Sequence, residues 1–196
     1  MRLLLKELLA QLSDAAVQKF GAGYAEVRAQ RLNKTSLTLK ENRVEAAKQG
    51  IEEGVALRVL VNGAWGFASV VSLDPVVLTT AVSDSCKMAN AASSRLKSPI
   101  KLAETKTVED RVRVKPKKNP SAISMEEKIK TAQSINEAIL GYDNRVKSCT
   151  VDYLDLTGTN FFVNSEGTCI EQDKLYVWSR ITAAAVSMGG FTFSRE

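Results

Sequence analysis

The side chains that could carry out chemistry in this sequence are carboxylates, hydroxyls, thiols and amines, because it contains no histidine. Histidine is the side chain whose unperturbed pKa lies nearest neutrality, and it is the commonest metal ligand in proteins. Its absence excludes catalytic triads and dyads built on imidazole, and also zinc sites that contain histidine. The sequence therefore favours a binding or assembly role, or a part of an enzyme whose reactive residues lie on another stretch of polypeptide.

The remaining reactive groups do not form a recognisable catalytic set. Two carboxylates that act as acid and base must converge in a cleft, whereas Glu52-Glu53 and Glu109-Asp110 would point to opposite faces of an extended segment. The cysteines Cys86, Cys149 and Cys169 have wide spacing without C-x-x-C, so we predict reduced thiols rather than a disulfide framework or a zinc knuckle. We expect no catalytic residue and no metal ligand in this chain.

A run of basic residues could contact a polyanion. Its members are Arg111, Arg113, Lys115, Lys117 and Lys118. The first three are spaced by two, so on a strand they would line one face and could follow a phosphate backbone. No aromatic residue lies between them, which weakens a stacking model for single strands. The net charge of +5 permits such contacts without requiring them. A solvated edge strand, protected by its charge against further pairing, is the favoured interpretation.

Trp65 stands out because Gly63 and Gly66 flank it within the segment 63–69. Glycines on a strand allow another backbone or side chain to approach closely. The favoured role of the Trp65 ring is core packing beneath a helix, and the alternative is an aromatic wall of a cleft or of a subunit contact.

The elements that must position these residues are indicated by the spacing of apolar side chains. Three- and four-residue steps predict an amphipathic helix over 3–20, ended by Gly21 and Gly23. Alternation over 24–71 predicts about four antiparallel strands, with turns at Glu41-Asn42 and Asn62-Gly63. A helix should follow, because Asp74 can cap its first turn and Pro75 suits the first helical position.

The second half repeats the order of helix and then strands. A capping box at 124–127 opens a helix that ends at Gly141. Strands are predicted at about 146–156, 160–163 and 168–188, with 164–167 as the hairpin loop between the last two. The predicted class is α+β, with helices packed on antiparallel β-sheets in two successive helix-then-strands units.

These patterns divide the chain along its length. We predict an N-terminal α+β domain over 1–97, a charged connector or edge strand over 98–120, and a second α+β unit over 121–196. The chain stops just after a long strand without a closing helix, so we expect the second unit to be incomplete at its C-terminus. No segment approaches membrane-spanning length and no secretory signal is evident, so we expect a cytoplasmic protein without membrane contact.

Several segments resemble a known family. They are Asn42 to Glu45, Gly54 to Val59, Asn62 to Ser69, and Phe162 to Gly167 followed by a long strand. In this order, with an amphipathic helix before each region, they resemble the N-terminal portion of the TldD/PmbA family, whose members were once named modulators of DNA gyrase. The resemblance spans most of the chain, and the segments before residue 70 are the more specific.

The resemblance implies a part in intracellular proteolysis. The family includes zinc metallopeptidases whose catalytic subunit carries an H-E-x-x-x-H helix in a later region and pairs with a related subunit that lacks it. This sequence has no such helix, so by itself it should not hydrolyse peptides by that mechanism, and zinc is expected only if a downstream catalytic region exists. The resemblance further implies an extended peptide substrate and a homodimer or heterodimer with a related subunit. The candidate cleft or interface residues are Arg58, Trp65, Phe67, Asn164 and Glu166. A polyanion or nucleic-acid binding module that uses the basic run is the alternative.

Overall fold

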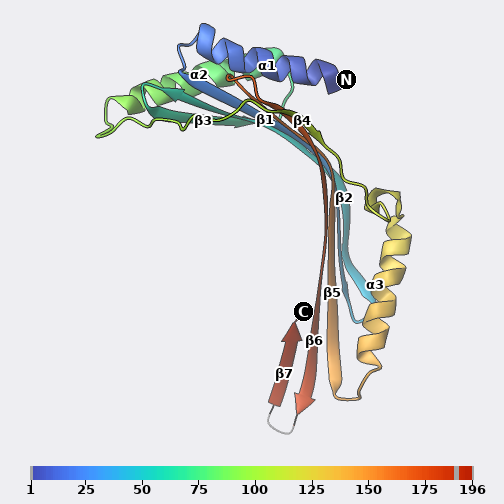
Figure 1. Ribbon diagram of the computed structural model, residues 1–196. Coiled ribbons are helices and arrows are strands. Elements are labelled where there is room, and N and C mark those ends of the chain that lie inside the picture. The colour runs from blue at the N-terminus through green and yellow to red at the C-terminus, as the bar shows by residue number, and fades with distance from the viewer. Residues whose placement is uncertain (1, 188–189, 196) are drawn as a thin grey trace. The chain divides into compact units, whose positions relative to one another are not determined.

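The computed structural model describes residues 2–187 and 190–195, and within these ranges the chain forms three α-helices, one 3₁₀ turn and a seven-stranded sheet (Figure 1). In chain order the elements are α1 (Arg2–Gln18), β1 (Tyr24–Lys40), β2 (Arg43–Val61), β3 (Ala64–Val70), α2 (Pro75–Ser93), β4 (Glu109–Val112), η1 (Pro120–Ala122), α3 (Met125–Leu140), β5 (Val146–Asn164), β6 (Cys169–Ser187) and β7 (Gly190–Arg195). The strand order is β3-β2-β1-β5-β6-β4, and β7 also pairs with β6. The predicted α+β class is confirmed.

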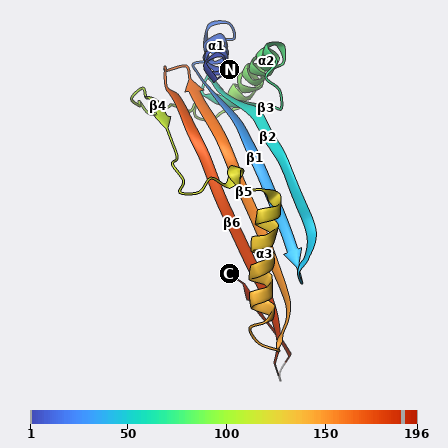
Figure 2. The ribbon, with the colours of Figure 1, turned by 90° about the vertical axis from the view of Figure 1, so that its right-hand side faces the viewer.

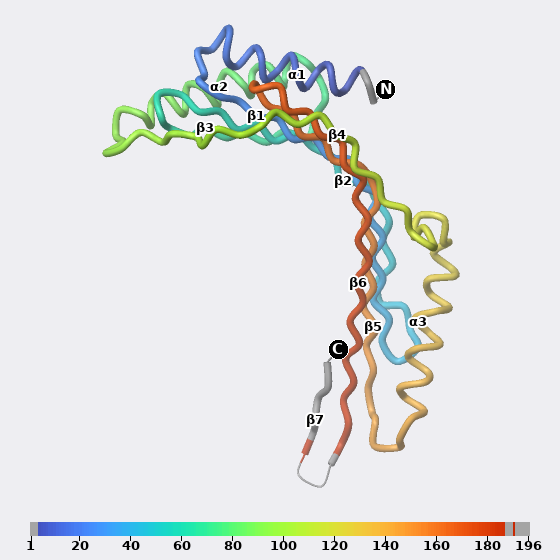
Figure 3. The backbone as a smooth tube through the Cα atoms, viewed as in Figure 1, coloured from blue at the N-terminus to red at the C-terminus, as the bar shows by residue number. Residues whose placement is uncertain are grey.

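The chain groups into two compact units, each assembled from separated stretches. Unit 1 comprises 1–31, 52–113 and 159–173, and unit 2 comprises 32–51, 114–158 and 174–196. The backbone passes from one unit to the other within long strands such as β1 and β2, as the tube in Figure 3 lets the reader follow. The sequence analysis predicted a different division, into a domain over 1–97 and a second unit over 121–196. That division concerns boundaries along the sequence, and it stays a prediction.

In unit 1, α1 and α2 lie on one face of the strands (Figure 1). The core between them is formed by buried aliphatic side chains, among which are Leu9 and Leu12 of α1, Leu78 and Val82 of α2, and Val27, Leu57 and Val59 of the strands. Helix α2 approaches β3 so closely that a Cβ added at Gly66 would lie 2.0 Å from the Ser85 carbonyl oxygen. Only glycine fits there, which explains one of the two glycines beside Trp65.

In unit 2, α3 packs along the strands (Figure 2). Its buried partners are small and aliphatic, and they include Leu37, Leu39, Ala132, Cys149 and Val151. The polar side chain of Asn136 is fully enclosed beside them: it donates from Nδ2 to the Cys149 carbonyl at 2.9 Å and accepts from the Asn42 amide at 3.0 Å. These bonds join α3 to β5 and to the turn between β1 and β2. None of the described helices has the length and apolar character that a membrane crossing requires.

The predicted turns and caps are confirmed. Asn42, Asn62 and Gly63 adopt φ values of 61°, 50° and 79°, which type I′ hairpin turns require. The Asp74 carboxylate accepts from the Val76 amide at 2.8 Å, and Ser124 Oγ accepts from the Glu127 amide at 3.1 Å, so both helices begin where the sequence indicated.

The strand count differs from the prediction. The region 24–71 holds three strands rather than about four, because β1 and β2 run for 17 and 19 residues. The segments 146–156 and 160–163 form one continuous strand, β5. Thr157 and Thr159 are β-branched and keep the backbone extended, and Gly158 alone does not turn it.

The charged stretch 98–120 contains the short strand β4, which stands at the end of the strand order. It pairs in parallel with β6, so that Arg111 lies opposite Glu171. The segment 100–107, which precedes β4, is fixed at both ends by hydrogen bonds. The Ile100 amide donates to the Gly63 carbonyl at 2.9 Å, and the Thr107 hydroxyl donates to the Glu166 carbonyl at 3.0 Å.

Candidate functional site

Alternation along the strands of unit 1 gathers charged and aromatic side chains on the face that carries no helix. Ala25, Val27, Val59, Phe161 and Val163 belong to the core beneath α1 and α2. Because successive strand residues point to opposite faces, their neighbours lie on the other face. We call this set the arginine–aromatic face, and its members are Tyr24, Glu26, Arg28, Arg58, Trp65, Phe67, Phe162 and Asn164.

A buried carboxylate lies at the centre of the arginine–aromatic face. Glu26 is 6% exposed. Its Oε1 lies 3.1 Å from Arg58 Nε and 3.4 Å from Arg28 Nε. Its Oε2 accepts from Arg58 Nη2 at 3.1 Å and from the Tyr24 hydroxyl at 2.9 Å. Four donors from three side chains thus compensate the desolvation of a single carboxylate. A buried carboxylate without such partners would strongly destabilise the fold.

Each of the two guanidinium groups lies over an aromatic ring. The Arg58 guanidinium carbon lies 4.4 Å from the centroid of the Trp65 ring, and that of Arg28 lies 4.7 Å from the Phe162 ring. Tyr24 meets Trp65 edge to face at 6.1 Å. Phe67 is the cross-strand partner of Arg58. Stacking of this kind adds cation–π attraction and restricts the rotamers of both arginines.

The electrostatics of the arginine–aromatic face are asymmetric. The side chains of Arg28 and Arg58 are 63% and 46% exposed, whereas Glu26 is enclosed behind them. One negative and two positive charges leave a net charge of +1 on the solvent side. Burial is the main cause that raises the pKa of the Tyr24 phenol; the nearby Glu26 carboxylate raises it further, and the hydrogen bond with Asn164 opposes the shift. Tyr24 therefore donates to Glu26 as a neutral phenol.

The structure places four of the five predicted cleft or interface residues on the arginine–aromatic face: Arg58, Trp65, Phe67 and Asn164. The interpretation that Trp65 packs beneath a helix is wrong. Gly66 faces α2, so its neighbour Trp65 points to the helix-free face by strand alternation.

Asn164 ends β5, and the fifth predicted residue, Glu166, belongs to the turn between β5 and β6. Asn164 Oδ1 accepts from the Thr168 amide at 2.8 Å and from the Glu166 amide at 3.2 Å, so it organises the turn, and its Nδ2 lies 3.5 Å from the Tyr24 hydroxyl. Glu166 contributes its carbonyl oxygen to the bond with Thr107. A contact of either residue with substrate stays a prediction.

Much of the predicted polyanion run is paired within the protein. Arg111 Nε lies 3.4 Å from the buried carboxylate of Glu171. Arg113 forms ion pairs with Glu171 at 3.0 Å and with Asp173 at 2.6 Å. Lys118 pairs with Glu127 at 2.8 Å. Arg111 and Arg113 do share one face, but that face is turned to acidic side chains. A polyanion contact through this run, including Lys115 and Lys117, stays a prediction.

Glu26, Arg28 and Tyr24 were missed by the sequence analysis. The stretch Tyr24-Ala25-Glu26-Val27-Arg28 alternates polar and apolar side chains, which indicates one solvated face. That alternation could have placed the three residues together. It could not have shown that Glu26 is buried, because its partner Arg58 lies 32 residues away along the chain.

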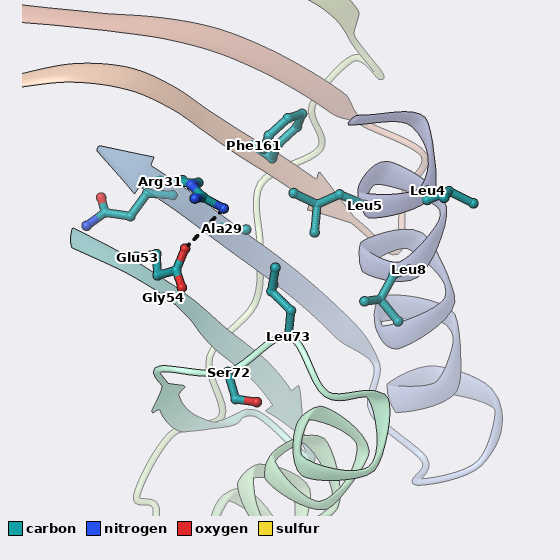
Figure 4. A pocket seen from close by; sticks show the side chains of 11 residues that line it. Leu4, Leu5, Leu8, Ala29, Arg31, Glu53, Gly54, Ser72, Leu73 and Phe161 are labelled. Atoms are coloured by element: carbon teal, nitrogen blue, oxygen red, sulfur yellow. Dashed lines mark ion pairs between the residues drawn. The ribbon is translucent and has the colours of Figure 1, made fainter. Parts of the chain in front are cut away.

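A separate apolar pocket lies on the helix side of unit 1 (Figure 4). Its volume is about 240 Å³, and its walls include Leu5 and Leu8 of α1, Leu73 and Phe161. The ion pair between Arg31 and Glu53, with 3.6 Å between Nη1 and Oε2, is the charged part of its lining. A cavity with these walls can shelter an aliphatic group.

The residues that the structure describes do not fit a zinc site. In 2–187 and 190–195 no group of three or more cysteine, aspartate or glutamate side chains is placed to hold a metal ion. Burial raises the pKa of the Cys86 and Cys149 thiols, which disfavours the thiolate form that binds zinc. We therefore derive no metal-dependent step from this chain.

Comparisons with known proteins point to one family. The model of "PmbA/TldA metallopeptidase domain 1" matches residues 25–93, and the model of "PmbA/TldA metallopeptidase central domain" matches residues 118–195. A metalloprotease of Methanocaldococcus jannaschii is 30% identical over 177 residues, which cover 88% of this chain and 38% of that protein. A metalloprotease of Methanothermobacter thermautotrophicus is 28% identical over 173 residues, which cover 88% of this chain and 36% of that protein.

Solved structures share the fold. A Bacteroides thetaiotaomicron protein described as a modulator of DNA gyrase superimposes with a TM-score of 0.74 at 20% identity, over 97% of this chain and 44% of that one. TldE from Thermococcus kodakarensis superimposes with a TM-score of 0.71 at 16% identity, over 96% of this chain and 42% of that one. The chain thus spans less than half the length of the relatives it matches.

Proposed function

Because the chain belongs to the PmbA/TldD metallopeptidase family, we propose that it is the non-catalytic N-terminal part of a metallopeptidase subunit, with roles in the peptide-substrate cleft and in dimer assembly. Its sequence has no histidine, so any zinc would be held by residues outside it. In this proposal the chain binds and orients an extended polypeptide, and hydrolysis takes place elsewhere in the assembly.

The observation that carries the peptide-binding role is the position of β3. It stands at the end of the strand order, so one side of its backbone can accept a further strand. Backbone hydrogen bonds along such an edge give affinity without demanding a particular sequence, which suits unfolded substrates. Phe67 on the same strand is 54% exposed and lies opposite Arg58, so an added strand would meet an aromatic and a cationic side chain.

The proposed setting is the cytoplasm, in a homodimer or in a heterodimer with a related subunit. Three cysteines without a disulfide support a reducing compartment. Exposed apolar side chains on β6, Tyr176 and Val177, support a role for unit 2 in subunit contact, because large apolar side chains are enriched in the centre of interfaces.

Binding of a neutral, fluorescein-labelled ten-residue peptide of valine, threonine and glutamine tests the peptide-binding role by fluorescence anisotropy. We expect saturable binding that weakens several-fold in Phe67→Ser. The matched control is Val71→Ser, since Val71 is 84% exposed and follows the end of β3. Absence of saturable binding up to millimolar protein, or equal weakening by both variants, would contradict the role of β3.

A further inference from the structure

We propose that the arginine–aromatic face selects acidic segments of an extended polypeptide, by taking a carboxylate side chain against the outer sides of Arg28 and Arg58. The inference rests on the proposed peptide binding and names the substrate class that such binding would prefer. Its occupant is one acidic residue of an extended polypeptide that lies over β2 and β1 on this face, not a free small anion.

Charge is unevenly distributed on the arginine–aromatic face. Glu26 neutralises one of the two guanidinium groups, and it is only 6% exposed. An anion that approaches from solvent therefore meets Arg28 and Arg58, which are 63% and 46% exposed, before it meets the carboxylate. The bonds to Glu26 use Nε of Arg28 and Nε and Nη2 of Arg58. A guanidinium carries five N–H donors, so each arginine retains donors for a second carboxylate.

The two guanidinium groups are preorganised. A free arginine side chain loses rotamer entropy when it is immobilised. Here Glu26 fixes the inner edge of both guanidinium groups, and the rings of Trp65 and Phe162 lie 4.4 and 4.7 Å from their centres. Much of the ordering cost is thus met on folding, before any ligand arrives. A planar, held guanidinium suits a carboxylate, with which it can form two parallel hydrogen bonds.

The arginine–aromatic face disfavours basic segments. A lysine or arginine of the peptide would face a net charge of +1, and the face of the Trp65 indole that could attract a cation is already covered by Arg58. The buried Glu26 offers such a side chain no accessible partner. Acidic, neutral and basic peptides should therefore bind in that order of affinity.

The closing experiment compares three ten-residue peptides that share an extended, valine- and threonine-rich backbone and differ only at two central positions, which are Glu, Gln or Lys. Fluorescence anisotropy with the full chain gives each dissociation constant at low and moderate salt. We expect the Glu peptide to bind about threefold to tenfold more tightly than the Gln peptide, in line with exposed charge-assisted hydrogen bonds, and the Lys peptide to bind more weakly than either. The preference for Glu should shrink at moderate salt.

Two variants assign the preference to residues. Arg28→Gln should remove most of the difference between the Glu and Gln peptides. Arg31→Gln is the matched control, because Arg31 lies on the same strand but, by alternation, on the opposite face, where it pairs with Glu53. Arg58→Lys adds a second test: it keeps the charge across from Glu26 but loses the planar fork, so the preference should fall while circular dichroism remains that of the parent.

Each contrary outcome has a distinct meaning. If the Gln and Glu peptides bind with equal affinity, the acidic preference is wrong while the proposed peptide binding stands. If no peptide binds, the proposed function fails, and the inference fails with it. If a ten-nucleotide single-stranded DNA displaces the Glu peptide with similar affinity, the arginine–aromatic face is a polyanion site and the inference is overturned.

Discussion

Each unit encloses charged side chains whose partners come from distant parts of the sequence. In unit 1 they include Glu26, and in unit 2 they include Lys128, whose Nζ lies 2.6 Å from Asp155 Oδ2 with both side chains under 5% exposed. Lys128 also donates to Thr35 Oγ1 at 3.3 Å and lies over the Tyr153 ring. Burial, and then the nearby Asp155 carboxylate, raise the pKa of the Tyr153 phenol far above its ordinary value. The phenol therefore stays neutral beside this ion pair.

Lys128→Met should lower the free energy of unfolding by about 3–5 kcal/mol, because it leaves the Asp155 carboxylate buried without a cation. Urea denaturation followed by circular dichroism measures the change. The double variant Lys128→Met, Asp155→Asn should recover part of the loss, since it removes both charges. Lys130→Met is the control, because Lys130 pairs with Glu126 on the exposed side of the same helix and should change stability by less than about 0.5 kcal/mol. A loss from Lys128→Met no larger than that of the control would show that the pair is solvated.

At the scale of elements, local chemistry was sufficient to predict where helices begin and where hairpins turn. Asp74, Ser124 and the pair Asn62-Gly63 act within a few residues of themselves, so their effect can be inferred from a short window. Arg58, Trp65 and Phe67, which the family resemblance pointed to, lie on two strands joined by one of these tight turns.

A short window of sequence could not predict which strands pair when they are far apart along the chain. The parallel pairing of β4 with β6 joins residues about sixty positions apart, and Glu171 attracts Arg111 and Arg113 only once this register has formed. The orientation of Trp65 depended on which of two alternating faces α2 would cover. Both faces of β3 carry apolar residues, so the pattern alone did not decide between them.

The packing of α2 on β3 makes a prediction at this scale. Gly66→Ala should lower the free energy of unfolding by about 1–3 kcal/mol, because its Cβ would overlap the Ser85 carbonyl and force the helix away from the strand. Gly50→Ala is the matched control, since a Cβ there meets nothing within 4 Å and the backbone is not left-handed. Urea denaturation followed by circular dichroism measures both. Equal stability of the two variants would mean that α2 can shift without loss.

At the scale of the whole molecule, the stability of unit 1 depends on stretches that lie far apart in the sequence. Unit 1 contains 159–173, which follow α3 in the sequence. Phe161 and Val163 from this stretch belong to the core with Leu9 and Leu78, and the Ser165 amide donates to the Ala25 carbonyl at 2.8 Å. Burying two such apolar side chains contributes about 3–6 kcal/mol, which is comparable with the whole stability of a small domain.

A fragment that ends before 159 should therefore fail to fold, even though the sequence pattern suggested a domain over 1–97. We expect fragment 1–113 to show no cooperative transition in urea, and fragment 1–173, which holds all three stretches of unit 1, to show one. Trp65 is the single tryptophan in both fragments, because the second of the two in the sequence is Trp178, so its fluorescence reports on unit 1 alone. A cooperative transition in 1–113 would mean that the first two stretches form a stable core without β5, and the boundary near residue 98 would then mark an independent domain.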